Sequence, residues 1–139
     1  MNEAATLARE IARYAEDKKA IDLVELDLRG VLGYTDYFVI CSGNTHRQAR
    51  AIHDGILEGL KHEHGTQPRR VEGSAEGGWI LMDYLDVVVH IFTPQARAFY
   101  RLEQLWGEAP ARPATQGSEA SGDSAGEDPE RLTRRSATG

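Results

Sequence analysis

Hydrophobic residues recur at helical spacing in three stretches of the chain, residues 4–17, residues 46–63 and a stretch that begins at Thr93-Pro94. Apolar residues three and four positions apart lie on one face of a helix. The residues that share this spacing are Leu7, Ile11 and Tyr14 in the first stretch, Ala49, Ile52, Ile56 and Leu60 in the second, and Phe99, Leu102 and Trp106 in the third. Proline suits the first turn of a helix, so Pro94 supports the third one. The pattern therefore predicts three helices.

Five shorter stretches have the composition of β-strands. Residues 21–28 mix acidic and apolar residues, as in a strand with one wetter face, and residues 37–41 are all β-branched, aromatic or apolar, as in a strand covered on both faces. The other three stretches are residues 69–72, 79–82 and 86–92. The last two flank a short turn, so we expect them to be antiparallel neighbours. The order α-β-β-α-β-β-β-α predicts an α/β domain with a mixed five-stranded sheet flanked by helices.

The composition changes near Gly107. Residues 108–139 contain a single large apolar residue, Leu132, among Gly, Pro, Ser, Thr, Ala and charged residues. Such a segment cannot bury enough apolar surface to offset the entropy lost on ordering. We therefore expect one folded domain over residues 1–107 and a disordered tail over residues 108–139.

Charge and composition exclude several classes of protein. The net charge is −6 with 16 basic and 22 acidic residues, and the isoelectric point is near 5.3. This argues against a protein that neutralises nucleic-acid phosphates broadly, and it permits an acidic surface that meets a basic partner. No apolar run approaches the roughly 18 residues of a membrane span, and the N-terminus lacks the features of a secretory or transit peptide. Cys41 is the single cysteine, so we expect no disulfide and a cytoplasmic location.

Several polar groups are candidates for chemistry, and each has a plainer interpretation. Ser42-Gly43, between a strand and a helix, could hold a phosphate, but a helix cap explains the same residues. Asp83 and Asp86 could bind a metal ion, as in enzymes that act on nucleotides, but acidic residues also form turns. His62 and His64 have no third ligand nearby in the sequence, and His90 lies in an apolar strand, where a hydrogen-bonded core histidine is the usual finding.

The segment Gly77–Asp86 (GGWILMDYLD) stands out because it combines two large amphipathic aromatic residues with two carboxylates. Aromatic side chains surrounded by polar groups are typical of the centre of a protein–protein interface. Trp79 and Tyr84 are equally compatible with an ordinary hydrophobic core. The pattern alone leaves both interpretations open.

At these residues the chain resembles the ribosomal silencing factors, also called the Iojap-like proteins. The resemblance spans about residues 3–106. The segments that carry it are Lys18–Leu28, Asp36–Gly43, the helix with Gln48, Ala51-Ile52 and Asp54, Glu72-Gly73, Trp79–Phe92, and finally Arg97, Phe99-Tyr100, Leu102-Glu103 and Leu105-Trp106. Asp36–Gly43 and Trp79–Phe92, in this order, are the most specific of them.

The resemblance implies a nucleotidyltransferase-like fold without catalytic residues, metal ligands or a cofactor. Members of the family bind the large ribosomal subunit through its ribosomal protein fourteen and block association with the small subunit when nutrients are scarce. They also tend to form homodimers when free. The family's binding surface corresponds here to Trp79, Leu81, Asp83, Tyr84 and Asp86, and no membrane or sequence-specific nucleic-acid contact is implied.

One position departs from the family pattern. Leu85 lies in the turn where glycine is common in the family, so it is strained if the turn needs a positive φ angle. Two other functions remain as alternatives. One is a nucleotidyltransferase-like enzyme that uses Asp83 and Asp86 for Mg²⁺ and Ser42-Gly43 for phosphate, and the other is a dimeric scaffold that self-associates through the Trp79 segment.

Overall fold

The computed structural model describes residues 3–102 and 111–113. The elements follow the order α1 (Glu3–Asp17), β1 (Ile21–Asp27), β2 (Tyr37–Ser42), α2 (His46–His64), β3 (Arg70–Ser74), β4 (Trp79–Asp83), β5 (Val87–Phe92), α3 (Pro94–Tyr100) and β6 (Ala111–Pro113). The sheet has the strand order β3-β4-β5-β2-β1-β6. β2 and β5 pair in parallel, and the other neighbouring strands are antiparallel. The predictions of an α/β domain with a mixed sheet and three helices, and of antiparallel pairing between β4 and β5, are confirmed.

β6 adds a sixth strand that the hydrophobic pattern does not predict. Its three residues pair antiparallel with β1, with Ala111 opposite Leu26 and Pro113 opposite Val24. A strand this short, ending in a proline, has no alternation to detect in the sequence. β6 falls within residues 108–139, for which the composition predicts a disordered tail. The expected boundary at residue 107 and the other residues of that segment lie outside the described residues.

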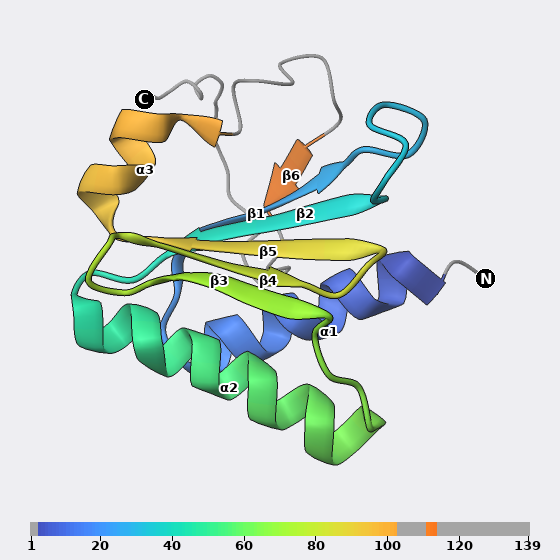
Figure 1. The fold of residues 1–139 in the computed structure, drawn as a ribbon, viewed down its shortest axis with the longest axis horizontal. Helices are drawn as coiled ribbons and strands as arrows, with labels where there is room; N and C mark the ends of the chain where they lie inside the picture. Colours follow the sequence, from blue (N-terminus) through green and yellow to red (C-terminus); the bar gives the residue numbers. More distant parts are fainter. Residues whose placement is uncertain (1–2, 103–110, 114–139) are drawn as a thin grey trace.

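The sheet has two differently covered faces. α1 and α2 lie on one face, and α3 lies on the other near the end of the sheet (Figure 1). We call these the two-helix face and the α3 face. Sheet residues in the core under α1 and α2 are Leu23, Tyr37, Val39, Cys41, Ile80, Met82, Val87, Val89 and Ile91. Sheet residues in the smaller cluster on the α3 face include Leu26, Phe38, Ile40, Val88 and Phe92. Every residue of β2 and β5 is buried, as the unbroken apolar run of residues 37–41 predicts.

Both ends of α2 have side-chain or backbone caps. The Thr45 hydroxyl accepts the Gln48 N–H at 3.0 Å, and the Gln48 side-chain oxygen accepts the Asn44 N–H at 2.7 Å. The first bond caps a free N–H of the helix start, and the second differs from a capping box because Gln48 accepts from the residue before the cap. At the other end, Gly65 takes a left-handed conformation and donates its N–H to the Leu60 and Lys61 carbonyls. The cap interpretation of the turn after Ser42-Gly43 is confirmed.

α3 is shorter than the spacing of Phe99, Leu102 and Trp106 predicts. The helix ends at Tyr100, because Arg101 has a left-handed φ of 50°. Phe99, placed on the buried stripe by the pattern, is 78% exposed, whereas Leu102 is buried. Trp106 lies outside the described residues. Arg97 holds α3 to the sheet, since its Nη1 donates to the Asp22 carbonyl at 2.6 Å and to the Ser42 hydroxyl at 3.2 Å.

β3 forms one edge of the sheet and is exposed along its whole length. Arg70 and Glu72 lie on it, and their side chains approach to 3.3 Å. Gly73 has a φ of 82°, and a Cβ at this position would lie 2.0 Å from the Trp79 carbonyl oxygen. Only glycine fits here, because any other residue would have both an unfavourable backbone conformation and a direct clash.

The contact between α1 and α2 depends on a missing side chain. A Cβ at Gly59 would lie 2.4–2.7 Å from three ring carbons of Tyr14. Tyr14 is in the core cluster under the two helices. Glycine within a helix costs about 1 kcal/mol relative to alanine, so its presence in α2 is explained by the close approach of this ring.

We predict that Gly59→Ala lowers the free energy of unfolding by about 1–3 kcal/mol, because the methyl group overpacks the α1–α2 contact. The matched control is Gly55→Ala, also in α2, whose Cβ would meet the exposed side chain of Lys18. That flexible chain can move away, so the control should be neutral or stabilising by up to about 1 kcal/mol. Urea denaturation measures both. Equal effects of the two substitutions would contradict the role of Tyr14.

Candidate functional site: the face of strand β4

Strand alternation separates the five predicted site residues. Trp79, Leu81 and Asp83 point to the α3 face, where their cross-strand partners on β5 are Phe92, His90 and Val88. Tyr84 lies in the core cluster of the two-helix face. Asp86, in the turn, is exposed. The structure therefore brings Trp79, Leu81 and Asp83 together on one surface and puts the Tyr84 side chain on the opposite side.

Trp79 is half-buried and has ring contacts on several sides. Its ring centroid lies 4.9 Å from that of Phe92 and 4.6 Å from that of Tyr100 on α3. The indole Nε1–H donates to His90 Nδ1 at 3.0 Å. Trp79 thus joins β4, β5 and α3 while part of its surface stays open to solvent. Leu81, next on the same face, is also half-buried.

Tyr84 is buried, with 6% of its surface exposed. Its hydroxyl has no hydrogen-bond partner among the described residues. Burial raises the pKa of Tyr84 to about 12, so the phenol is neutral at physiological pH. Of the two interpretations that the sequence leaves open for the aromatic residues, the core one describes Tyr84.

Asp83 is a buried carboxylate held by two arginines and a backbone group. Its oxygens lie 3.0 Å from Arg69 Nη2 and 3.5 Å from Arg70 Nε, and one oxygen accepts the Leu85 N–H at 2.8 Å. Burial by itself raises the pKa of the carboxyl, but the Leu85 bond and the two guanidinium groups outweigh burial and hold the pKa below its ordinary value. Asp83 is therefore ionised, and its charge is matched within the protein. Sequence spacing could not find this, since Arg70 begins the neighbouring strand β3 and Arg69 directly precedes it.

The turn between β4 and β5 is a γ-turn centred on Leu85. The Asp86 N–H donates to the Tyr84 carbonyl at 3.0 Å, and Leu85 has a φ of 80°. A γ-turn with positive φ is strained for any residue with a side chain. The expectation that Leu85 is strained here is confirmed. The Leu85 side chain is 48% exposed, so packing does not explain its place in the turn.

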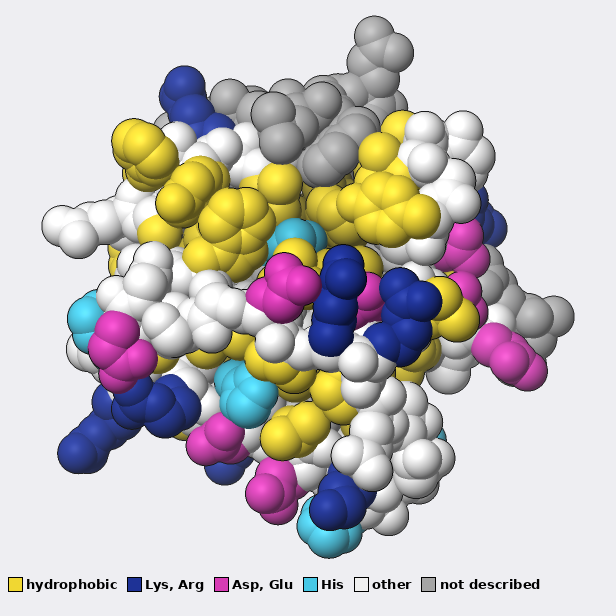
Figure 2. All heavy atoms as spheres, in the orientation of Figure 1, with side chains coloured by type: hydrophobic (Ala, Val, Ile, Leu, Met, Phe, Trp, Pro, Cys, Tyr) yellow, Lys and Arg dark blue, Asp and Glu magenta, His cyan; other side chains and the backbone are white. Residues whose placement is uncertain are grey.

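The surface around this site has an apolar part and a charged part. Figure 2 shows hydrophobic side chains gathered in the upper half of the view, with a row of acidic and basic side chains directly below them. Phe99 is 78% and Tyr100 44% exposed; Tyr100 packs on Trp79, and Phe99 packs on Tyr100. The helical pattern assigned Phe99 to the core, so the exposed aromatic pair is a feature that sequence reasoning missed.

The residues of the enzyme hypothesis have other partners. The Ser42 hydroxyl accepts a hydrogen bond from Arg97, and Asp83 is bound to Arg69 and Arg70. A hollow at the starts of α2 and α3 is lined by residues 44–47 and 93–95. Within it, the hydroxyl groups of Thr45 and Thr93 cap the two helices. The cap of α2 is thus Thr45 and not Ser42, and Asp83 accepts the Leu85 N–H as a turn-forming residue does.

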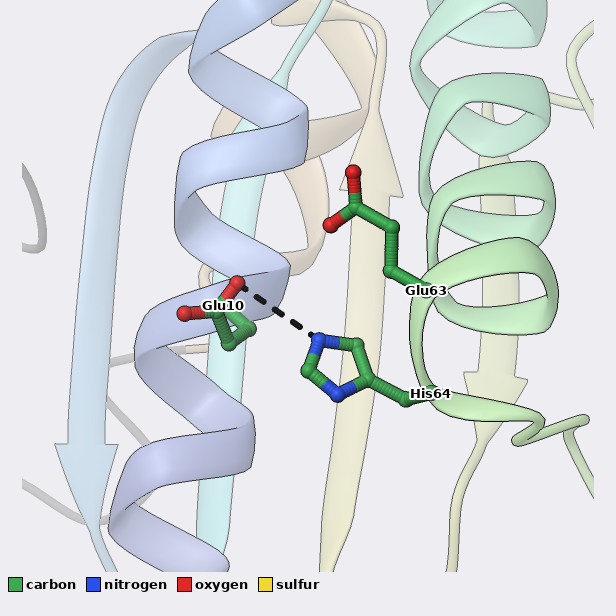
Figure 3. Close-up of side chains that lie close together, drawn as sticks. All are labelled: Glu10, Glu63 and His64. Atoms are coloured by element: carbon green, nitrogen blue, oxygen red, sulfur yellow. Dashed lines mark ion pairs between the residues drawn. The ribbon is translucent and has the colours of Figure 1, made fainter.

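Three potential metal ligands, Glu10, Glu63 and His64, lie close together between α1 and α2 (Figure 3). Arg13 Nη2 approaches a Glu10 oxygen at 2.6 Å and a Glu63 oxygen at 3.5 Å, and the Tyr14 hydroxyl donates to Glu63. His64 Nε2 lies 3.8 Å from Glu10. The two carboxylates thus already have a cation between them, and the cluster is an interhelical ion-pair network.

We predict that Asp83→Asn lowers the free energy of unfolding at pH 7 by about 1–3 kcal/mol, because bonds to the charged carboxylate are lost. Since the folded-state pKa lies below the ordinary value of 3.8, this stabilisation is complete above pH 3.8 and is lost as pH falls through the folded-state pKa. Urea denaturation between pH 2.5 and 7 measures it. Glu72→Gln, an exposed carboxylate beside Arg70, is the control and should change stability by less than about 1 kcal/mol. A pH-independent difference would contradict the charge argument.

We predict that Leu85→Gly raises the free energy of unfolding by about 1 kcal/mol, because glycine adopts positive φ without strain. For a domain of this size the melting temperature should rise by about 4–8 °C. Leu85→Ala is the matched control: it removes the same exposed side chain but keeps a Cβ at positive φ, so its melting temperature should stay near that of the wild type. Equal melting temperatures for the glycine and alanine variants would show that the turn is unstrained.

None of the helices among the described residues is long and apolar enough to cross a membrane.

Comparison with known proteins identifies the family of this chain. The family described as "Ribosomal silencing factor during starvation" matches residues 1–138. The chain is 43% identical over 99 residues to ribosomal silencing factor RsfS of Bacillus subtilis, an alignment that covers 71% of this chain and 83% of the relative. It is 34% identical over 109 residues to the chloroplastic protein Iojap of Zea mays, covering 77% of this chain and 46% of that protein.

The fold has a counterpart among crystal structures. A protein from Chromobacterium violaceum superposes with a TM-score of 0.68 at 32% identity, covering 86% of this chain and 98% of that one. The resemblance seen in Asp36–Gly43 and Trp79–Phe92 is thus supported over nearly the whole sequence and in three dimensions. The chain belongs to the RsfS/Iojap family of ribosomal silencing factors.

Proposed function

We propose that this protein binds the large ribosomal subunit through its ribosomal protein fourteen and blocks association with the small subunit, which represses translation when nutrients are limiting. The observation that carries the proposal is the family match over residues 1–138, together with the relative from Bacillus subtilis, whose name is ribosomal silencing factor. Repression of this kind is steric. It needs a bound protein that covers the docking face of the small subunit, and it needs no catalytic residue, metal ion or cofactor.

The contact surface that we propose is the exposed side of β4 and the turn that follows it. Trp79 and Leu81 are half-buried, so each can bury further apolar area against a partner. A Trp in the centre of an interface often contributes most of its binding energy. Asp86 is exposed and can pair with a basic group of the ribosomal protein. Such exposed ion pairs give only about 0–1 kcal/mol each and act mainly on orientation and association rate.

Asp83 and Tyr84 support the proposed surface from below and do not form its apolar centre. Asp83 is bound to Arg69 and Arg70, whose side chains are 57% and 61% exposed, so the carboxylate presents two guanidinium groups at the rim of the surface. Tyr84 packs in the core behind the turn and fixes the place where β4 ends. The surface offered to the ribosome therefore combines an apolar centre with charges of both signs.

We further propose that the free protein forms a homodimer, and that it works in the cytoplasm, where bacterial ribosomes are. The relative from Zea mays is described as chloroplastic, so the family also includes an organellar member. If the dimer uses the β4 surface, then self-association and ribosome binding compete. A cross-linked dimer that binds large subunits as well as the monomer does would contradict this competition.

Co-sedimentation with purified large subunits tests the proposed surface. Trp79→Ala is expected to weaken binding about 30-fold or more, as for an interface residue worth at least about 2 kcal/mol, and Asp86→Lys to weaken it severalfold. Asp83→Lys should abolish binding, because it removes the anchor of both arginines. Glu58→Lys, which makes the same charge change on exposed α2, is the matched control and should bind normally. Circular dichroism confirms that each variant is folded.

An order-of-addition experiment tests the steric mechanism. Large subunits incubated first with the protein should fail to form complete ribosomes on a sucrose gradient when small subunits are added. Small subunits added first should exclude the protein from the pellet. Normal binding by folded Trp79→Ala would contradict the surface, and binding that leaves subunit joining unchanged would contradict the mechanism.

A further inference from the structure

His90 is a buried histidine in the middle of β5, on the α3 face, and only 3% of its surface is exposed. Its Nδ1 accepts the Trp79 indole N–H at 3.0 Å. Because Nδ1 is the acceptor, the proton of the neutral ring is on Nε2. Burial lowers the pKa of His90 to about 3, so the ring stays neutral, and this hydrogen bond is kept, at physiological pH.

Stability does not explain a histidine at this position. Among the described residues its Nε2 is buried without a hydrogen-bond partner, and an unmet buried donor weakens folding. The ring lies among aromatic neighbours, with its centroid 4.4 Å from that of Phe38 and 6.4 Å from that of Phe92. An apolar side chain of similar size would fill the same space without an unmet donor. Packing alone therefore does not account for the polar ring.

The feature that histidine supplies here is an acceptor for Trp79. Trp79 contacts Phe92 and Tyr100 by ring packing, which restricts the ring less strictly than a hydrogen bond does. Ring packing alone tolerates an indole that is rotated or flipped about its second side-chain torsion, because the distribution of that torsion is broad. The hydrogen bond to His90 Nδ1 selects the single orientation in which Nε1 points to the neighbouring strand.

We propose that His90 is a positioning residue for ribosome binding, which holds Trp79 in the orientation that the partner contacts. This inference rests on the proposed function, since it assigns a role within the same surface. A side chain already held in its bound orientation loses less freedom on binding, and affinity is higher for that reason. His90 itself is buried and acts through Trp79.

Two substitutions separate positioning from packing. His90→Leu removes the unmet Nε2 donor but leaves the Trp79 N–H without its acceptor, and these two effects on stability oppose each other, so its unfolding midpoint should stay near that of the wild type. Its affinity for large subunits should fall about 10-fold, because the freed indole must then be ordered on binding. In His90→Asn, the side-chain oxygen lies near the position of Nδ1 and can accept the same bond. The asparagine variant should be less stable, because it is smaller, and should still bind within about 3-fold of the wild type.

The indole N–H resonance of Trp79 gives a direct readout in the full chain. It is assigned by its loss in Trp79→Phe, which distinguishes it from the resonance of Trp106. The resonance should shift in His90→Leu and stay near its wild-type position in His90→Asn. A merely structural histidine would instead make affinity follow stability, so that the asparagine variant binds worse than the leucine one.

Two results would overturn the inference. One is wild-type affinity in His90→Leu, and the other is weak binding in His90→Asn while its indole resonance is unchanged. Both are distinct from a failure of the proposed function, in which the wild-type protein itself does not sediment with large subunits.

Discussion

The parallel pairing of β2 with β5 is the constraint on which the arrangement of the fold depends. Six residue pairs, from Tyr37 opposite Val87 to Ser42 opposite Phe92, join the two strands, and every residue in them is buried. Side chains of a strand alternate between the faces of a sheet, so this register decides which residues pack under α1 and α2 and which face α3. A slip by one residue would exchange the two sets.

The orientation of the proposed contact surface follows from this register. β4 is antiparallel to β5, and the pairing of Trp79 with Phe92 and of Leu81 with His90 puts the apolar residues of the site on the α3 face. The same alternation puts Tyr84 in the other core. A segment that looks like one mixed aromatic and acidic cluster in the sequence is thus divided by the sheet into an exposed half and a buried half. The exposed half has a neutral, hydrogen-bonded tryptophan at its centre and a matched set of charges at its rim.

The sequence was sufficient to predict the helices, five strands and the hairpin, because each depends on a local period of apolar residues. Strain at Leu85 was expected if the turn has a positive φ, because glycine is common at this position in the family that the chain resembles, and the φ of 80° meets that condition. What it missed depends on distant partners. The ion pairs of Asp83 with Arg69 and Arg70 join the two strands of a hairpin, and the bond from Trp79 to His90 crosses from β4 to β5. β6 has only three residues, and the left-handed Arg101 ends α3 before the spacing of Phe99 and Leu102 suggests.

The two edges of the sheet bear on how copies of this chain can meet. An open edge invites another strand to add main-chain hydrogen bonds. Here β3 has charged residues at Arg70 and Glu72 and a left-handed bend at Gly73, and β6 ends in Pro113, which has no N–H to donate. Both edges are thereby unfavourable for continuing the sheet from one molecule into the next. The homodimer that we propose would therefore use side-chain surfaces, which a competing protein can displace, and growth into open-ended fibrils is disfavoured.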